Sequence, residues 1–171
     1  MRKTLLTTLM LLAAWTAAAQ VTIPGTKVSF DFPNGGWKYL QTTKIDANTS
    51  LYLYSYAAQN LVDANGDTTV PCLRVYVRTG YKQSVYDFAY ERYVQQPFQS
   101  VYEYTDGLPK DALGYIGLYT DAVEKRDYEI RMVLLRQGNN AVEFRLETTR
   151  DTYEQMAAEF EAVAATLKTG K

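Results

Sequence analysis

The sequence predicts an α+β fold in which an antiparallel sheet of about six strands has helices packed on both faces. Two stretches with helical spacing, one mid-chain and one at the end, predict the helices. The segments between them alternate apolar and polar side chains, as strands do. One of these segments is apolar on both faces, which indicates a strand covered on both sides.

The first 20 residues have the features of a secretory signal peptide. Arg2 and Lys3 form a basic start, residues 5–15 an apolar core, and three alanines at 17–19 a cleavage site. The apolar run is too short for a stable membrane anchor, and no cysteine follows it that could carry a lipid. We therefore predict a signal peptide over residues 1–20, a single domain over residues 21–171, and a periplasmic or secreted location.

Composition excludes several classes of function. Without Arg2 and Lys3, 16 basic residues face 19 acidic ones, a net charge of −3, so nucleic acid is not an expected partner. Histidine, the commonest general base and metal ligand, is absent. Cys72 is the only cysteine, which leaves no intrachain disulfide. A buried apolar role suits Cys72, although a reactive thiol or an intermolecular bridge stays open.

The first half of the domain contains four short extended segments. They cover residues 27–32, 37–39, 51–58 and 73–78. Asn65-Gly66 predicts a tight hairpin turn between the last two. A two-residue loop there would pair Tyr54 with Val77, whereas a longer loop is the alternative.

A helix is predicted to begin after Ser84, because Asp87 three residues later completes a capping box. Its apolar stripe follows helical spacing, and Pro97 stops it. The stripe consists of Val85, Phe88, Ala89 and Tyr93.

Four further strands are predicted over residues 100–104, 114–121, 128–136 and 141–148. Taking Asn139-Asn140 as the last turn pairs Leu135 with Phe144 and, on the other face, Arg136 with Glu143. The strand over 128–136 is the one that is apolar on both faces, through Ile130, Met132 and Leu134.

The terminal helix is predicted over residues 151–168, with Asp151 as its cap and Glu154 completing a capping box. Glu159 lies off its apolar stripe. The stripe consists of Tyr153, Met156, Ala157, Phe160, Val163, Ala164 and Leu167.

This order of elements, with Phe-Pro-Asn-Gly-Gly-Trp at 32–37, Asp-Phe-Ala at 87–89 and Gly-Tyr-Ile-Gly at 114–117, resembles the PsbP-like group of proteins. The group includes a photosystem II extrinsic subunit and exported bacterial DcrB-like proteins. The resemblance covers nearly the whole mature chain and implies the sandwiched sheet described above. It implies little about activity, since members mostly bind a protein partner and share no catalytic residues that could be carried over.

Three clusters of polar residues are candidate sites. Arg74, Tyr76 and Arg78 share one strand face and are the predicted partner-binding residues, although their side chains could equally cover apolar surface. Residues 63–67 contain acidic groups as calcium loops do, but their glycine and glutamate spacing is wrong and a turn explains them. Residues 121–129 mix four acidic with two basic side chains. A hydrolase would need two of these carboxylates facing a cleft at a defined separation, whereas a solvated turn explains the mixed charges more simply.

These observations predict a non-catalytic exported domain that binds an unknown protein or cell-envelope partner. No catalytic residue, cofactor or metal is predicted. The alternative is a module that binds a small ligand or glycan in a groove lined by some of its 15 tyrosines. A hydrolase that uses two close carboxylates, one with a raised pKa, is the third hypothesis.

Overall fold

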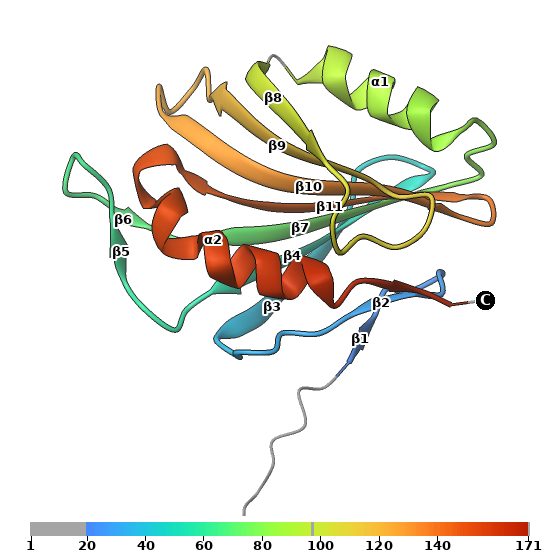
Figure 1. Ribbon diagram of the computed structural model, residues 1–171, viewed down its shortest axis with the longest axis horizontal. Coiled ribbons are helices and arrows are strands. Elements are labelled where there is room, and N and C mark those ends of the chain that lie inside the picture. Colours follow the sequence, from blue (N-terminus) through green and yellow to red (C-terminus); the bar gives the residue numbers. More distant parts are fainter. Residues whose placement is uncertain (1–19, 97, 171) are drawn as a thin grey trace, which may run out of the picture.

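Seven antiparallel strands form the main sheet, in the spatial order β3-β4-β7-β11-β10-β9-β8 (Figure 1). The computed structural model describes residues 20–96 and 98–170, so the predicted signal peptide lies outside the described residues except for Gln20. The strands of the main sheet are β3 (Trp37–Lys44), β4 (Thr49–Tyr56), β7 (Cys72–Thr79), β8 (Phe98–Tyr104), β9 (Leu113–Thr120), β10 (Asp127–Gln137) and β11 (Asn140–Thr149).

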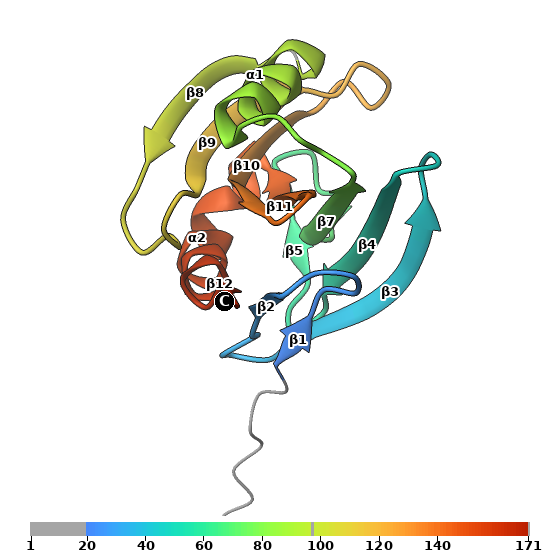
Figure 2. The ribbon, with the colours of Figure 1, turned by 90° about the vertical axis from the view of Figure 1, so that its right-hand side faces the viewer.

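Two helices and two small sheets complete the described chain. The helices are α1 (Val85–Gln95) and α2 (Arg150–Ala165). One small sheet joins β1 (Val21–Thr22), β2 (Val28–Phe30) and β12 (Lys168–Thr169), and the other joins β5 (Leu61–Val62) and β6 (Thr68–Thr69). Figure 2 shows the main sheet curving around α2 and the sheet that contains β1 and β2.

The predicted fold class, an α+β sandwich of about six strands with helices on both faces, is wrong. Strands hold 47% of the described residues and helices 18%, so the protein is mostly β, and its main sheet has seven strands. The helices are not packed on both faces: α2 packs along β10 and β11, whereas α1 buries only Phe88. The apolar second face of β10 is real, but aromatic side chains of neighbouring strands cover much of it.

Helix α2 covers the larger of two apolar clusters. Its predicted stripe is confirmed, with Met156, Phe160 and Val163 almost fully buried against β7, β10 and β11. Burying each such side chain contributes about 1.5–3 kcal/mol. The predicted cap is wrong: Thr149 is the N-cap, and Asp151 instead accepts a hydrogen bond from the Ala64 N–H. The helix ends at Ala165, earlier than predicted, because the chain turns to pair β12 with β2.

The two predicted hairpin registers are each displaced by an even number of residues, so every side chain keeps its predicted face. The loop between β4 and β7 is the longer alternative, because Asn65-Gly66 turns the small β5-β6 hairpin, and Tyr54 pairs with Leu73. In the final hairpin the turn is Gly138-Asn139, since Gly138 adopts the positive φ, and Val133 pairs with Phe144. Leu134, rather than Arg136, therefore faces Glu143.

Candidate functional site

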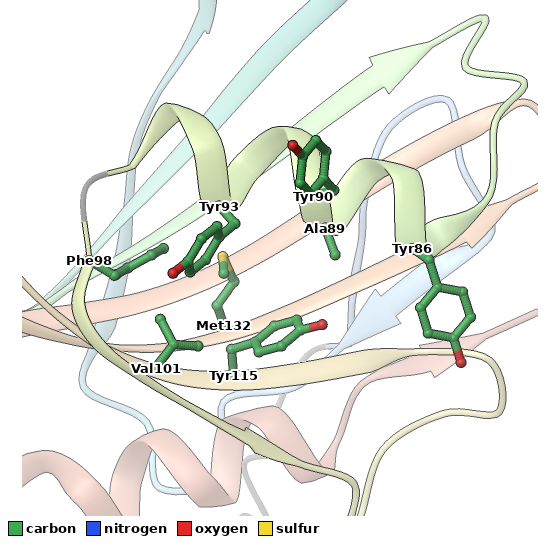
Figure 3. A pocket seen from close by; sticks show the side chains of 8 residues that line it. All are labelled: Tyr86, Ala89, Tyr90, Tyr93, Phe98, Val101, Tyr115 and Met132. Carbon is green, nitrogen blue, oxygen red and sulfur yellow. The ribbon is translucent and has the colours of Figure 1, made fainter.

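An aromatic pocket lies between α1 and strands β8, β9 and β10 (Figure 3). Its volume is about 320 Å³. Five aromatic rings, a methionine and two small aliphatic side chains line it: Tyr86, Ala89, Tyr90, Tyr93, Phe98, Val101, Tyr115 and Met132. A concave, apolar site with aromatic walls is the kind of surface that binds ligands in other proteins.

Helix α1 supplies one wall, and local chemistry fixes where it starts. The Ser84 hydroxyl accepts the Asp87 N–H at 3.1 Å, and the Asp87 carboxylate accepts the Ser84 N–H at 2.9 Å, so the predicted capping box is confirmed. The Phe88 side chain is buried against the Tyr81 ring, with the two ring centroids 5.3 Å apart. Ala89 and the three helix tyrosines lie on the side of α1 that lines the pocket.

Two ion pairs on the opposite side of α1 fasten it to the sheet. Arg92 Nε lies 2.5 Å from the Glu143 carboxylate, which is buried on β11. Arg78 on β7 donates to Glu91 at 2.7 Å, and the Tyr81 hydroxyl donates to the same carboxylate at 3.2 Å. The helix is therefore held by Phe88 and by two charged contacts on the side away from the aromatic pocket.

The tyrosines of α1 are unusually exposed. Tyr86, Tyr90 and Tyr93 have 70%, 71% and 57% of their surface accessible. Their spacing of four and three residues places them on one helix face. Contiguous exposed aromatic surface marks interaction sites in soluble proteins, because leaving it in water costs free energy.

The floor of the pocket depends on a glycine. Phe98 lies over Gly117 of β9, where an added Cβ would be 2.8 Å from the Phe98 ring. Phe98 then reaches Tyr93 across the pocket, with centroids 6.3 Å apart. Met132 of β10, only 4% exposed, closes the bottom.

The lining of the aromatic pocket is uncharged, but the carboxylate of Glu103 lies next to it. None of its eight lining residues carries a formal charge. Glu103 on β8 pairs directly with Tyr115 on β9. Burial raises the pKa of the Tyr115 hydroxyl, and the Glu103 carboxylate raises it further. The Glu103 carboxylate therefore places a negative charge beside the Tyr115 end of the pocket.

The predicted partner-binding residues lie on β7, outside the aromatic pocket. Arg74 forms an ion pair with the buried Glu147, the Tyr76 ring lies 5.4 Å from the Arg92 guanidinium, and Arg78 binds Glu91. Tyr76 and Arg78 line a second, polar pocket of about 460 Å³ on the other side of α1. These contacts support the covering role for the stripe, and a role in partner binding stays a prediction.

The other sequence candidates have local partners. The Asp63 carboxylate accepts the N–H groups of Asn65 and Asp67 at 2.9 Å and lies 3.2 Å from Arg126. An arginine thus occupies the place that the calcium interpretation assigned to a metal. Within residues 20–96 and 98–170, no group of three or more potential metal ligands is present. Cys72 is half-buried, and burial raises the pKa of its thiol.

The acidic stretch over residues 121–129 forms the turn between β9 and β10 and the first residues of β10. Asp121 accepts the N–H groups of Val123 and Glu124 at 2.8 Å, which lowers its pKa. Burial raises the pKa of Glu129, and the Glu154 carboxylate raises it further. Neither Glu129 nor Glu154 lines the aromatic pocket.

In the described part of the chain, no helix is long and apolar enough to span a membrane.

Most of the pocket residues were missed by sequence reasoning. The sequence places Tyr93 and Ala89 on an apolar stripe and predicts no role for Tyr86 and Tyr90. The available signal was the recurrence of tyrosine at 86, 90 and 93 directly after a capping box. Phe98, Val101, Tyr115 and Met132 come from three strands, and only the sheet order brings them to α1.

No protein-family model and no curated protein matches the chain. Among solved structures, a crystal structure from Bacteroides thetaiotaomicron VPI-5482 aligns with a TM-score of 0.54 at 16% identity, over 90% of this chain and 49% of the other. This chain therefore spans about half the length of that protein. LpqN, which is involved in cell envelope biogenesis of Mycobacterium tuberculosis, aligns with a TM-score of 0.54 at 14% identity, over 88% of each chain. These likenesses show a shared fold, and the resemblance to the PsbP-like group stays a prediction.

Proposed function

We propose that this protein is an exported, non-catalytic binding protein of the cell envelope that holds part of an envelope component in its aromatic pocket. The observation that carries the proposal is the pocket itself. Five rings from α1, β8 and β9 surround a cavity of about 320 Å³, and the three on α1 remain exposed. Tyrosine supplies large contact area with few rotatable bonds, so such surfaces bind at a low cost in entropy.

Two further observations support this proposal. The predicted signal peptide would carry the chain out of the cytoplasm, and LpqN, which shares the fold, is involved in cell envelope biogenesis. The PsbP-like resemblance points the same way, because members of that group mostly act by binding a partner. The absence of histidine and of a nucleophile–base pair in the sequence motivates the non-catalytic part. Turnover of any substrate by the purified mature chain would overturn that part.

A glycan-binding module is the second candidate. Sugar rings present apolar faces that pack against aromatic side chains, and the tyrosine hydroxyls can hydrogen-bond the sugar rim. The tyrosine-rich lining favours this candidate over a flat protein interface. A thermal-shift screen against mono- and disaccharides tests it, since a ligand at 100 times its Kd adds about 2.7 kcal/mol of stability.

The proposed function predicts that filling the pocket abolishes binding. Ala89→Trp places a large side chain inside the cavity without removing any aromatic wall. Ala158→Trp, at an exposed position of α2, is the matched control. Crosslinking in native envelope followed by mass spectrometry identifies the component that wild type captures. We expect Ala89→Trp to lose at least about 90% of it and Ala158→Trp to retain it; equal capture by both would contradict the proposal.

A further inference from the structure

We propose that the aromatic pocket binds an organic cation, with the trimethylammonium group of choline as its model. This inference rests on the proposed function, because it names the chemical class of the ligand in the same pocket. Three observations carry it: the number of rings, the charge around them, and the way this protein pairs tyrosines with cations elsewhere.

The rings provide the attraction. Aromatic faces carry the negative part of the ring quadrupole, so a cation within about 6 Å of a centroid is stabilised. Tyr93 and Phe98 form one tilted pair, 6.3 Å apart, with Tyr115 on the neighbouring strand (Figure 3). A quaternary ammonium group suits this lining better than a primary amine, because it has no N–H groups that would need acceptors.

The surrounding charge has the matching sign. Val101 lines the pocket, and Glu103, two residues further along β8, lies on the same face. Among the described residues Glu103 has no ion pair, so its charge remains available to a ligand. Arg92, the arginine of α1, points to Glu143 and the second pocket instead. A cation therefore meets no repulsive side chain in the lining.

Elsewhere in the fold, tyrosine rings hold arginine guanidinium groups. The centroid distances are 5.0 Å for Arg78 over Tyr81, 5.4 Å for Arg92 over Tyr76, 4.6 Å for Arg131 over Tyr104 and 5.1 Å for Arg145 over Tyr119. The aromatic pocket gathers more rings than any of these pairs, yet its lining contributes no cation. A cationic ligand would provide the positive charge that arginine provides in these four pairs.

The volume limits the size of the ligand. Ligand pockets range from about 300 to 1,000 Å³, so a cavity of about 320 Å³ is at the small end. It accommodates a trimethylammonium head and a short stem. The stem would leave past the exposed Tyr86 or Tyr90. The same head group occurs in free choline-type solutes and in phosphatidylcholine lipids.

The decisive experiment compares choline with its uncharged isostere, 3,3-dimethylbutan-1-ol. Both have the same shape, and only choline is charged, so the comparison isolates the charge. We expect calorimetric titration of the mature protein to give choline at least about 10-fold tighter binding, as a cation–π contribution near 1.4 kcal/mol requires. Equal affinity for the two compounds would overturn the inference.

Variants locate the effect. Tyr93→Leu keeps apolar volume but removes a ring, and we expect it to weaken choline binding at least about 5-fold, whereas Tyr93→Phe keeps the ring and retains affinity. Glu103→Gln should weaken choline binding about 2-fold and reduce its salt dependence. Tyr102→Leu, at an exposed β8 position that faces away from the pocket, is the control. Unchanged melting temperatures show that each variant is folded.

Vesicles distinguish the two sources of the head group. Binding to phosphatidylcholine vesicles but not to phosphatidylglycerol vesicles indicates the lipid, and binding to choline alone indicates a free solute; either outcome supports the inference. If neither choline nor phosphatidylcholine binds, the inference is wrong. The proposed function fails only if Ala89→Trp also leaves capture of the envelope component unchanged, so the two failures are separable.

Discussion

At the scale of single residues, a buried carboxylate on α2 has hydrogen-bond partners that the local sequence pattern does not predict. Glu159 was placed off the apolar stripe, yet it is only 9% exposed. Its two oxygens accept hydrogen bonds from Trp37 Nε1 and Asn34 Nδ2, each at 2.8 Å. Both partners precede it by more than 100 positions in the chain, so no local pattern predicts the contact.

We expect Glu159→Ala to lower the free energy of unfolding by about 1–3 kcal/mol, because it leaves the N–H of the half-buried Trp37 without an acceptor. Urea denaturation followed by tryptophan fluorescence measures this loss. Glu161→Ala, two residues along on the exposed face of α2, serves as the control and should change stability by less than about 0.5 kcal/mol. Equal losses in the two variants would show that the hydrogen bonds are unimportant.

Gly117 is a second residue on which the pocket depends. A methyl group there would meet the Phe98 ring, so Gly117→Ala should displace that wall and cost about 1–3 kcal/mol. We expect both the melting temperature and the affinity for the pocket ligand to fall. If Gly117→Ala binds ligand as wild type does, Phe98 is not a required wall of the site.

At the scale of elements, sequence reasoning succeeded where the determinants are local. The capping box of Ser84 and Asp87, the stripe of α2 and the alternation of the strands depend on neighbours a few residues apart. The register of the final hairpin failed because a different pair of turn residues moves the pairing by two positions, and that of β4 with β7 failed because the longer loop moves it by four. Neither shift changes a face. The cap of α2 failed because Asp151 found a partner in a distant loop.

The charged attachment of α1 gives a prediction at this scale. Arg92→Met removes the partner of the buried Glu143 and should cost about 3–5 kcal/mol. Adding Glu143→Leu removes the stranded charge and should recover most of that loss. Arg78→Met, which breaks the more exposed pair with Glu91, should cost less than about 1 kcal/mol. Thermal unfolding of the four proteins tests this, and failure of the double variant to recover would contradict it.

The capping box gives a pH-dependent prediction. Hydrogen bonds from the Ser84 hydroxyl and N–H hold the pKa of Asp87 below its ordinary value of 3.8. Because the folded-state pKa is the lower one, the cap stabilises the fold fully above pH 3.8 and loses its effect as pH falls through the folded-state pKa. The stability difference between wild type and Asp87→Asn should therefore be constant above about pH 5 and shrink below it. A difference that grows on acidification would contradict this assignment.

At the scale of the whole molecule, the two-sided apolar strand was interpreted correctly and its cover was not. Ile130, Met132 and Leu134 are buried as expected, but α1 is short and buries only Phe88, so it does not form a second layer. The incomplete cover is what leaves the aromatic pocket open. The pocket could not be predicted, because its walls come from one helix and three strands, and no local pattern in the sequence places α1 over β8, β9 and β10.

The central claim is that binding occurs at the aromatic pocket, and site-specific photo-crosslinking in the native envelope tests it most directly. A benzophenone amino acid would replace Tyr93 in the pocket or Tyr39 on β3, two tyrosines of nearly equal exposure, 57% and 55%. The account predicts a crosslinked adduct at position 93, whose yield falls when choline is added, and no adduct at position 39. Adducts of equal yield at both positions, or an adduct at position 39 alone, would contradict it.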